Sequence, residues 1–253
     1  FIESGVLKPI YVFPHAVSNK ASSPNTEDLG VNKEDNEFMF YSIFQWTERK
    51  NPTALLKAYL TEFTNKEKVS LVLKTYFMNP QNPTEKDQLK EAINNVKKRL
   101  YLPDMPKILL ISDLLSQDQI QRLHETGDCF VSLHRCEGFG MPIAEAMQAG
   151  KPVVVTDYGG PSDFVKNGVT GFTVPYMMTP CYGMPWPTYN GNMEWAEADI
   201  MAARKHMRHL YENRNIGKRI GKTAKEWLDD NFSHQKIGNN MLARLEEISK
   251  RLR

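Results

Sequence analysis

Two glutamates, Glu137 and Glu145, stand on either side of a Gly-Phe-Gly turn in the middle of the chain. Carboxylates accept hydrogen bonds from hydroxyl groups, so such a pair suits a ligand rich in hydroxyls. The backbone N–H groups of residues 138–141 fall at the expected start of a helix, where they lack intrahelical partners and favour an anion. Together these groups predict a site for a ligand that carries both a phosphate and several hydroxyls. A nucleotide sugar has this chemistry.

Short apolar runs on each side of the turn would position these groups. Residues 130–133 (FVSL) and 152–156 (PVVVT) are rich in β-branched side chains, which is typical of buried parallel strands. Between them, residues 141–148 (MPIAEAMQ) favour a helix, with a proline near the start and a glycine just past the end. We therefore expect Glu137 in the loop after a strand, and Glu145 about one and a half turns into the helix.

The rest of the chain alternates between strand-like and helix-like segments joined by loops. This alternation predicts an α/β fold, a Rossmann-like doubly wound parallel sheet with extra C-terminal helices. Two segments are expected to be irregular: the polar residues 21–36, an exposed loop, and the aromatic residues 175–195. The other expected strands are residues 10–13, 38–45, 69–77 and 107–112, and the other expected helices are residues 52–64, 84–100, 117–125, 197–213, 215–231 and 234–253.

Several cations follow the expected strands. Ligands of open α/β sheets bind outside the carboxyl ends of the strands, so Arg49, Lys50, Lys74 and Arg135 are candidates for neutralising a diphosphate. Each charge-assisted hydrogen bond would contribute about 1.5–3 kcal/mol. The alternative for both lysines is a solvated side chain at the end of an element. His134 could act as a general base, but its position just before the turn favours local packing.

The central segment EGFGMPIAEAMQAGKPVVVTDYGG (residues 137–160) resembles the E-x7-E region of retaining glycosyltransferases of family 4, which have the GT-B fold. RKN (residues 49–51), followed by PTALLKAY, is similar to the basic segment of that family. DFVKNGVTGFTVPY (residues 163–176) and WAEAD (residues 195–199) resemble its downstream pattern. These segments occur in the family's order and cover roughly residues 9–215.

The resemblance implies a donor-binding domain that moves a sugar from a nucleoside-diphosphate sugar to an acceptor hydroxyl. It implies that Glu137, the expected catalytic residue, faces the transferred sugar, that Glu145 binds the ribose hydroxyls, and that Lys50 binds the diphosphate. Catalysis would rest on electrostatic stabilisation of the leaving group, with no protein nucleophile. Where the family has an arginine, this chain has Phe44, so that Arg49 or Arg135 substitutes or the diphosphate is held more weakly. The other expected donor-binding residues are Lys74, Gly138, Phe139, Gly140 and Met141.

The resemblance also predicts how the chain is divided. Residues 1–36 would form an interdomain strand and exposed loop, residues 37–213 the Rossmann-like donor domain, and residues 214–253 helices packing on it. The opening KPIYVFPHAVSN resembles the start of the second GT-B domain, so the N-terminal acceptor-binding domain is expected to be absent here and to be a partner. We expect the chain alone to transfer little or no sugar.

The composition narrows the function classes. With 253 residues and a formal net charge of +2, the chain has no polyelectrolyte character, so nucleic-acid binding is not expected. Three cysteines lack metal-ligand spacing and fit a reducing compartment, which predicts a cytoplasmic protein. Frequent Lys and Arg near the C-terminus leave peripheral contact with a membrane surface open. No acidic D-x-D motif occurs, so neither a metal nor a cofactor is expected.

Other functions fit parts of the same pattern. A sugar-nucleotide 2-epimerase shares the fold and would need no acceptor. A non-catalytic nucleotide-sugar-binding module would bind the donor without transfer. On spacing alone, an ordinary strand-loop-helix unit with a solvated Glu137 is also compatible with the sequence.

Overall fold

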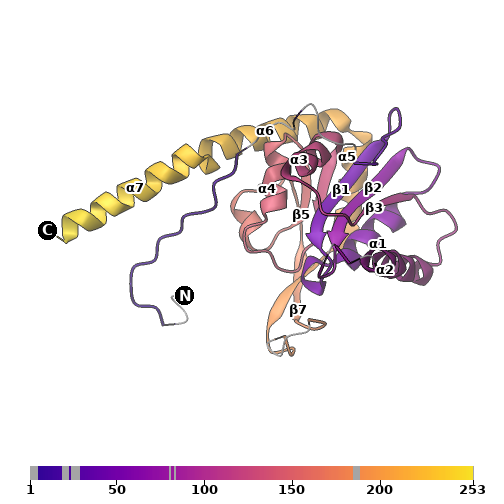
Figure 1. The fold of residues 1–253 in the computed structure, drawn as a ribbon, viewed down its shortest axis with the longest axis horizontal. Coiled ribbons are helices and arrows are strands. Elements are labelled where there is room, and N and C mark those ends of the chain that lie inside the picture. Colours follow the sequence, from indigo (N-terminus) through magenta and orange to yellow (C-terminus); the bar gives the residue numbers. More distant parts are fainter. Residues whose placement is uncertain are drawn as a thin grey trace.

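A six-stranded parallel sheet forms the centre of the computed structural model, which describes residues 5–18, 23, 29–79, 81–82, 84–184 and 189–252. The strand order is β3–β2–β1–β4–β5–β6, so the chain winds outward in both directions from the central pair β1 and β4 (Figure 1). This confirms the predicted doubly wound α/β class. The strands are β1 (Phe38–Gln45), β2 (Val69–Tyr76), β3 (Lys107–Ile111), β4 (Cys129–Ser132), β5 (Val153–Thr156) and β6 (Phe172–Val174).

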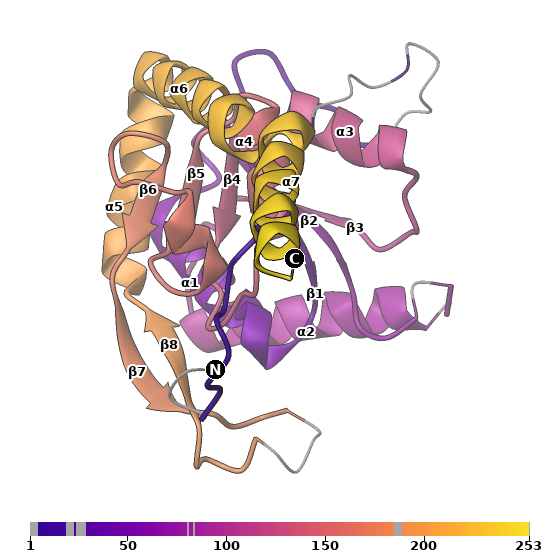
Figure 2. The same ribbon diagram turned by 90° about the vertical axis from the view of Figure 1, so that its left-hand side faces the viewer.

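Helices cover both faces of this sheet. Successive residues of β1 point to opposite faces, Phe38 and Phe40 into one apolar cluster and Met39 and Tyr41 into the other. The first cluster is closed by α1 (Pro52–Glu62), α2 (Glu85–Leu100) and α5 (Ile200–Glu212). The second is closed by α3 (Gln117–Thr126), α4 (Met141–Gln148) and α6 (Arg214–Phe232), and Figure 2 shows α3 and α4 across the sheet from α1 and α2.

Helix boundaries follow local signals where these are strong. The predicted cap Ser116 starts α3 with a full capping box, in which Gln119 N donates to Ser116 Oγ and Ser116 N donates to the Gln119 side chain. The helix α4 has the predicted bounds, and Gly140 precedes it in the left-handed conformation with φ 88°.

Three sequence predictions about the segments outside the sheet are wrong. Residues 10–13 form no strand, because no neighbouring strand supplies hydrogen bonds and their side chains are exposed. Residues 176–198 contain a two-stranded antiparallel ribbon of β7 (Tyr176–Pro180) and β8 (Glu194–Ala198) in place of the expected loop, although Trp186 lies outside the described residues. The helix predicted from residue 197 begins only at Ile200, after the cap Asp199.

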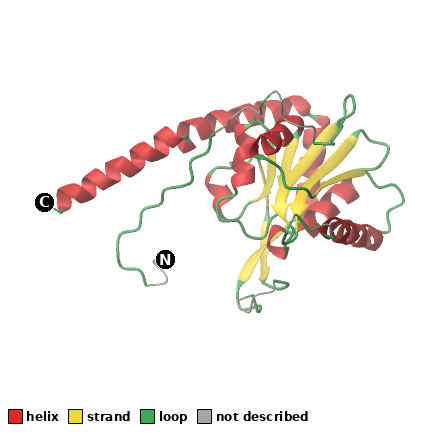
Figure 3. Cartoon of the chain, viewed as in Figure 1, coloured by secondary structure: helices red, strands yellow, loops and turns green. Residues whose placement is uncertain are grey.

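The ribbon β7–β8 extends away from the carboxyl edge of the sheet (Figure 3). Only Pro175 separates β6 from β7, so the last strand of the sheet leads directly into the ribbon. The backbone N–H of Ala196 in β8 donates to the carbonyl of Arg135 at 3.0 Å. The ribbon is therefore joined to the loop that follows β4.

The two C-terminal helices differ in how they pack. The helix α6 contributes Ala224, Leu228 and Phe232 to the core beneath α4. The helix α7 (His234–Arg251) buries Ile237 alone and projects from the body of the molecule (Figure 1), although the sequence predicts that both helices pack on the domain. Near the N-terminal segment, the Arg244 guanidinium lies 3.5 Å from the centre of the Tyr11 ring.

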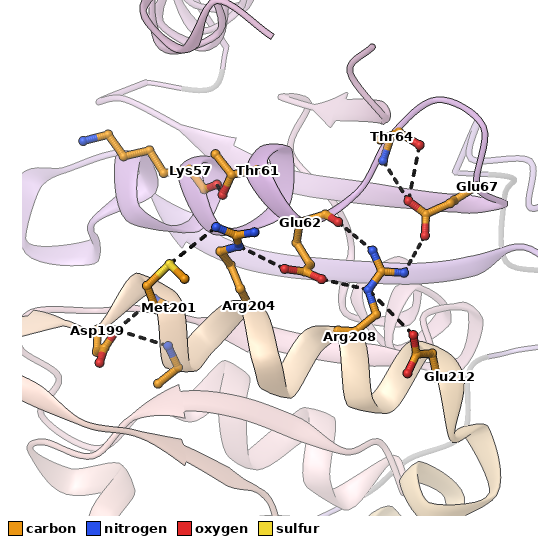
Figure 4. A network of polar contacts seen from close by, with 11 residues as sticks. Lys57, Thr61, Glu62, Thr64, Glu67, Asp199, Met201, Arg204, Arg208 and Glu212 are labelled. Atoms are coloured by element: carbon orange, nitrogen blue, oxygen red, sulfur yellow. Dashed lines mark hydrogen bonds and ion pairs between the residues drawn. The ribbon is translucent and has the colours of Figure 1, made fainter. Parts of the chain in front are cut away.

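A charged network fastens α5 to α1 on the first face (Figure 4). Glu62 accepts hydrogen bonds from Arg204 at 2.9 Å and from Arg208 at 2.7 Å, and Arg208 also donates to Glu67 at 2.5 Å. The Arg208 guanidinium lies over the ring of Phe63 at 4.4 Å. Partial burial opposes charge on Glu67, but hydrogen bonds from Arg208 and the Thr64 N–H outweigh it and lower the pKa of Glu67.

Candidate functional site

The loops that follow β1 and β4 meet at the point where the strand order reverses. This is the position at which open α/β sheets bind their ligands. The backbone N–H of Arg135 donates to the carbonyl of Arg49 at 2.9 Å, which joins the two loops directly. As the strand ends predict, Arg49 and Lys50 come together with Glu137.

Glu137 is partly buried and faces two cations. Its carboxylate forms a hydrogen-bonded ion pair with Lys50 Nζ, and the two side chains are 13% and 14% exposed. Arg49 Nη1 lies 3.8 Å from Glu137 Oε1 and donates to the carbonyl of Cys136 at 2.9 Å. The alternative of a solvated Glu137 is therefore wrong. The cluster carries one net positive charge, counted over these three side chains.

The turn between Glu137 and α4 presents free backbone donors. Within the described part of the chain, no protein group accepts a hydrogen bond from the N–H groups of residues 138–141. The Phe139 ring anchors the turn by packing against Phe164 at 5.3 Å and His15 at 5.2 Å between ring centres. These N–H groups lie at the start of α4, where the helix dipole favours negative charge.

Two glycines after β5 allow a second loop to press against this turn. Gly160 N donates to the Glu137 carbonyl at 3.0 Å. A Cβ at Gly160 would lie 2.8 Å from the carbonyl carbon of Gly138 and 2.9 Å from Phe139 Cα. Gly159 adopts φ 81°, and a Cβ there would lie 2.5 Å from the Glu137 carbonyl oxygen. Only glycine fits at these two places, so the DYGG segment holds the shape of the EGFG turn.

Glu145 lies in a different environment from Glu137. It lines a cavity of about 270 Å³, together with Met141 and Gln148 of α4, the start of α3 and residues 16–18. Its Oε2 lies 3.7 Å from Nε2 of the buried His124 on α3. The two glutamates thus have separate partners, and the turn at residues 138–140 lies between them along the chain.

Arg135 is held by protein groups. Its Nε donates to Glu197 on β8 at 2.5 Å, its Nη1 donates to the Glu48 carboxylate at 2.7 Å, and its guanidinium lies 5.0 Å from the Trp195 ring centre. These contacts bind the loop after β4 to the ribbon. Asn51, which caps α1, also donates to Glu197, at 3.1 Å. The sequence does not predict this supporting role of Glu197, because the residue falls at the start of the helix expected over residues 197–213.

Lys74 is buried near the carboxyl end of β2. It is 5% exposed, and its Nζ lies 5.4 Å from the Tyr76 ring centre. Burial lowers the pKa of Lys74, while the charge of Asp113 acts in the opposite direction. The alternative, that Lys74 is an exposed lysine at the end of a strand, is therefore wrong.

His134 has a local structural role. Its Nε2 donates to the Tyr158 carbonyl at 3.0 Å, and its Nδ1 lies 3.0 Å from Ser132 Oγ. Burial lowers the pKa of His134, despite the opposing effect of the Tyr158 hydrogen bond and of Glu137. Both ring nitrogens are engaged, as local packing predicts, and the ring links the loops after β4 and β5.

Two further kinds of feature are absent from the described ranges. No group of three or more His, Cys, Asp or Glu side chains there has an arrangement suited to a metal ion. No helix there combines the length and apolar character that crossing a bilayer requires.

Comparisons with known proteins agree with this architecture. The family model for group 1 glycosyl transferases matches residues 25–176. Sucrose synthase 2 of Pisum sativum is 24% identical over 155 residues, which are 59% of this chain and 19% of that protein. The chain therefore spans about a fifth of the length of this relative.

Solved structures share the fold. HepE from Anabaena, in complex with UDP and glucose, superposes with a TM-score of 0.61 at 21% identity, covering 84% of this chain and 49% of that one. A variant of TarM from S. aureus, in a complex that includes UDP, superposes with a TM-score of 0.66 at 17% identity, covering 96% of this chain and 40% of that one. At these identities the likeness shows the common fold.

Proposed function

The chain belongs to the group 1 glycosyl transferases, whose model matches more than half of it, and we propose that it is the donor-binding half of a retaining enzyme with the GT-B fold. In this proposal it moves a sugar from a nucleoside-diphosphate sugar to an acceptor hydroxyl. The observation that carries the proposal is the start of α4, where four N–H groups that have no acceptor among the described residues adjoin a cationic cluster and two carboxylates.

Each part of the donor has a matching group. The N–H groups of residues 138–141 would bind the diphosphate, and Lys50 and Arg49 would neutralise it. Arg49 is better placed than Arg135 to substitute for the family arginine, because Arg135 is bound to Glu48 and Glu197. Glu145 would accept hydrogen bonds from the ribose hydroxyls inside its cavity.

Glu137 would face the transferred sugar. When the bond between the sugar and the diphosphate breaks, negative charge develops on the leaving group and positive charge at the anomeric carbon. Fixed N–H dipoles and Lys50 would stabilise the first, and the Glu137 carboxylate the second. The acceptor's proton would pass to the donor phosphate on the same face, so no protein nucleophile is required. Lys74 would contribute a more distant positive charge from the end of β2.

The acceptor side of the reaction would come from an N-terminal domain outside this chain. Two observations support this arrangement. The chain covers 49% of the HepE structure and 40% of the TarM structure, and the candidate site lies at the carboxyl ends of the central strands β1 and β4. We propose further that the donor half works without a metal ion, because N–H groups and cations supply the neutralisation.

A thermal-shift panel tests the proposal. UDP, GDP and ADP are each added to the chain, and at least one should raise its melting temperature in a saturable, concentration-dependent manner. Glu145→Ala should abolish most of that shift, because it removes the acceptor for the ribose hydroxyls. Glu91→Ala is the matched control, since Glu91 is exposed on α2, away from the site.

The panel can also contradict the proposal. No shift with any of the three nucleotides would do so, and so would a shift that Glu145→Ala and Glu91→Ala leave equally intact. Activity itself is measured after the chain is recombined with an N-terminal half, with product analysis of both the acceptor and the nucleotide sugar. An altered sugar still attached to its nucleotide would indicate an epimerase.

A further inference from the structure

We propose that His124 is a positioning residue that holds the Glu145 carboxylate in place for the ribose, and that Tyr41 fixes His124 in turn. This inference rests on the proposed function and adds to it two residues that do not touch the ligand. The three side chains come from β1, α3 and α4, and they form a line from the centre of the sheet to the cavity at Glu145.

The imidazole of His124 is fully buried, and one of its two ring nitrogens has no hydrogen-bond partner among the described residues. Both His124 and Tyr41 are 0% exposed, and Tyr41 Oη lies 3.0 Å from His124 Nδ1. His124 Nε2 is buried and has no hydrogen-bond partner among the described residues. The polar group that it faces is the Glu145 carboxylate, at 3.7 Å. A buried ring nitrogen without a hydrogen-bond partner destabilises the fold. The short separation from Glu145 therefore suggests that this carboxylate is its partner when the ligand is bound.

The proton positions along this line follow from the burial of Tyr41. Burial raises the pKa of Tyr41 well above its ordinary value, and the nearby Cys129, Asp128 and Glu145 act in the same direction. The phenol therefore keeps its proton, and because His124 Nδ1 is its hydrogen-bond partner among the described residues, it donates a hydrogen bond to that nitrogen. A neutral imidazole that accepts at Nδ1 carries its hydrogen on Nε2, on the side of Glu145.

Glu145 is free enough to use this donor. Its side chain is 27% exposed, on the wall of the cavity. A small rotation that shortens the 3.7 Å separation by about 0.7 Å would give an ordinary hydrogen bond to His124 Nε2. One carboxylate oxygen would then be fixed by the protein and the other would be directed at the ribose. Such a bond reduces the side-chain freedom that ligand binding must otherwise remove.

The test compares UDP with 2′,3′-dideoxy-UDP by isothermal titration calorimetry. The ratio of their dissociation constants in the wild-type chain reports how strongly the ribose hydroxyls are recognised. His124→Phe preserves an aromatic ring of similar size but removes the N–H. It should lower this ratio by about three- to tenfold, as expected for one oriented hydrogen bond, and leave the affinity for 2′,3′-dideoxy-UDP nearly unchanged. Tyr41→Phe should lower the ratio in the same direction by a smaller factor.

Two further variants separate positioning from packing. His124→Gln, whose amide can donate in place of Nε2, should recover part of the ratio. In the double variant His124→Phe/Glu145→Gln the ratio should equal that of Glu145→Gln alone, since His124 acts only through Glu145.

A purely structural role would give another pattern. His124→Phe and Tyr41→Phe would then weaken both nucleotides alike, leaving the ratio at its wild-type value, and that result would overturn the inference. Because Tyr41→Phe removes a single hydroxyl, it keeps the test decisive if His124→Phe fails to fold. Failure of the wild-type chain to bind UDP, GDP or ADP is a separate outcome that contradicts the proposed function itself. If the His124→Phe variant binds UDP with the wild-type selectivity for the ribose hydroxyls, that result contradicts this inference alone.

Discussion

Lys50 and Glu137 neutralise each other across the loops that follow β1 and β4. Because Arg49 lies 3.8 Å from the same carboxylate, the three side chains retain a net positive charge beside the N–H groups of the turn. In the proposed complex, a diphosphate would bind without displacing Glu137, whose charge would still balance one cation. Lys50 is thus paired with Glu137, and the additional positive charge of Arg49 is left for the ligand in the proposed complex.

Replacing Lys50 by methionine tests that statement. Lys50→Met should weaken nucleoside-diphosphate binding by roughly ten- to a hundredfold, the effect of losing one charge-assisted hydrogen bond. Lys57→Met is the control, because Lys57 is an exposed lysine on the neighbouring α1. Titration calorimetry gives both constants, and equal affinities for the two variants would argue against a phosphate contact at Lys50.

The sequence identifies which residue types reach the carboxyl edge but not which of them are already paired. Strand ends and spacing correctly bring Arg49 and Lys50 to Glu137. The same reasoning treats Arg135 as equivalent, yet its guanidinium is bound to two glutamates, one of them 62 residues away on β8. Pairing of this kind depends on where the ribbon folds, and no local pattern encodes it.

The shape of the turn before α4 depends on the DYGG segment that packs against it. Gly160 packs so closely on Gly138 and Phe139 that a methyl group there must push the two loops apart. Gly160→Ala should lower the free energy of unfolding by about 1–3 kcal/mol, the usual cost of overpacking, and should also weaken nucleotide binding. Gly138→Ala is the control for stability, because a Cβ at Gly138 meets no other atom within 4 Å.

Chemical denaturation of both variants provides the comparison. Unchanged stability of Gly160→Ala would mean that the DYGG segment does not hold the turn. A loss of stability in Gly138→Ala equal to that in Gly160→Ala would mean that the turn tolerates no side chain at all, for reasons unrelated to the contact between the loops.

Sequence-based prediction of the elements succeeds where the signal is local. The helix α4 has a proline at its second position and Gly140 in front, and its bounds agree with prediction. The helix α3 begins at its predicted cap. The last two residues of β8, Glu197 and Ala198, are predicted to start a helix, because Glu and Ala have high helix propensity. The conformation of β8 comes from pairing with β7 and with Arg135, and such tertiary contacts override local propensity.

At the scale of the whole molecule, the candidate site lies at the carboxyl ends of the central strands. The ribbon β7–β8 projects from the same end of the sheet (Figure 3). The network of Glu62, Glu67, Arg204 and Arg208 fastens α5 across α1, so the ribbon is followed by a helix firmly attached to the body (Figure 4). Among its described residues, the helix α7 buries only Ile237, and its Arg244 guanidinium lies over the ring of Tyr11.

The structure of the chain with a bound nucleotide tests the central claim most directly. Crystals would be grown with whichever of UDP, GDP or ADP gives the largest thermal shift. We predict that the diphosphate oxygens lie within hydrogen-bonding distance of the N–H groups of residues 138–141 and of Lys50 Nζ, with the ribose hydroxyls on Glu145. A nucleotide bound elsewhere on the molecule, or one whose phosphates avoid the start of α4, would contradict the account.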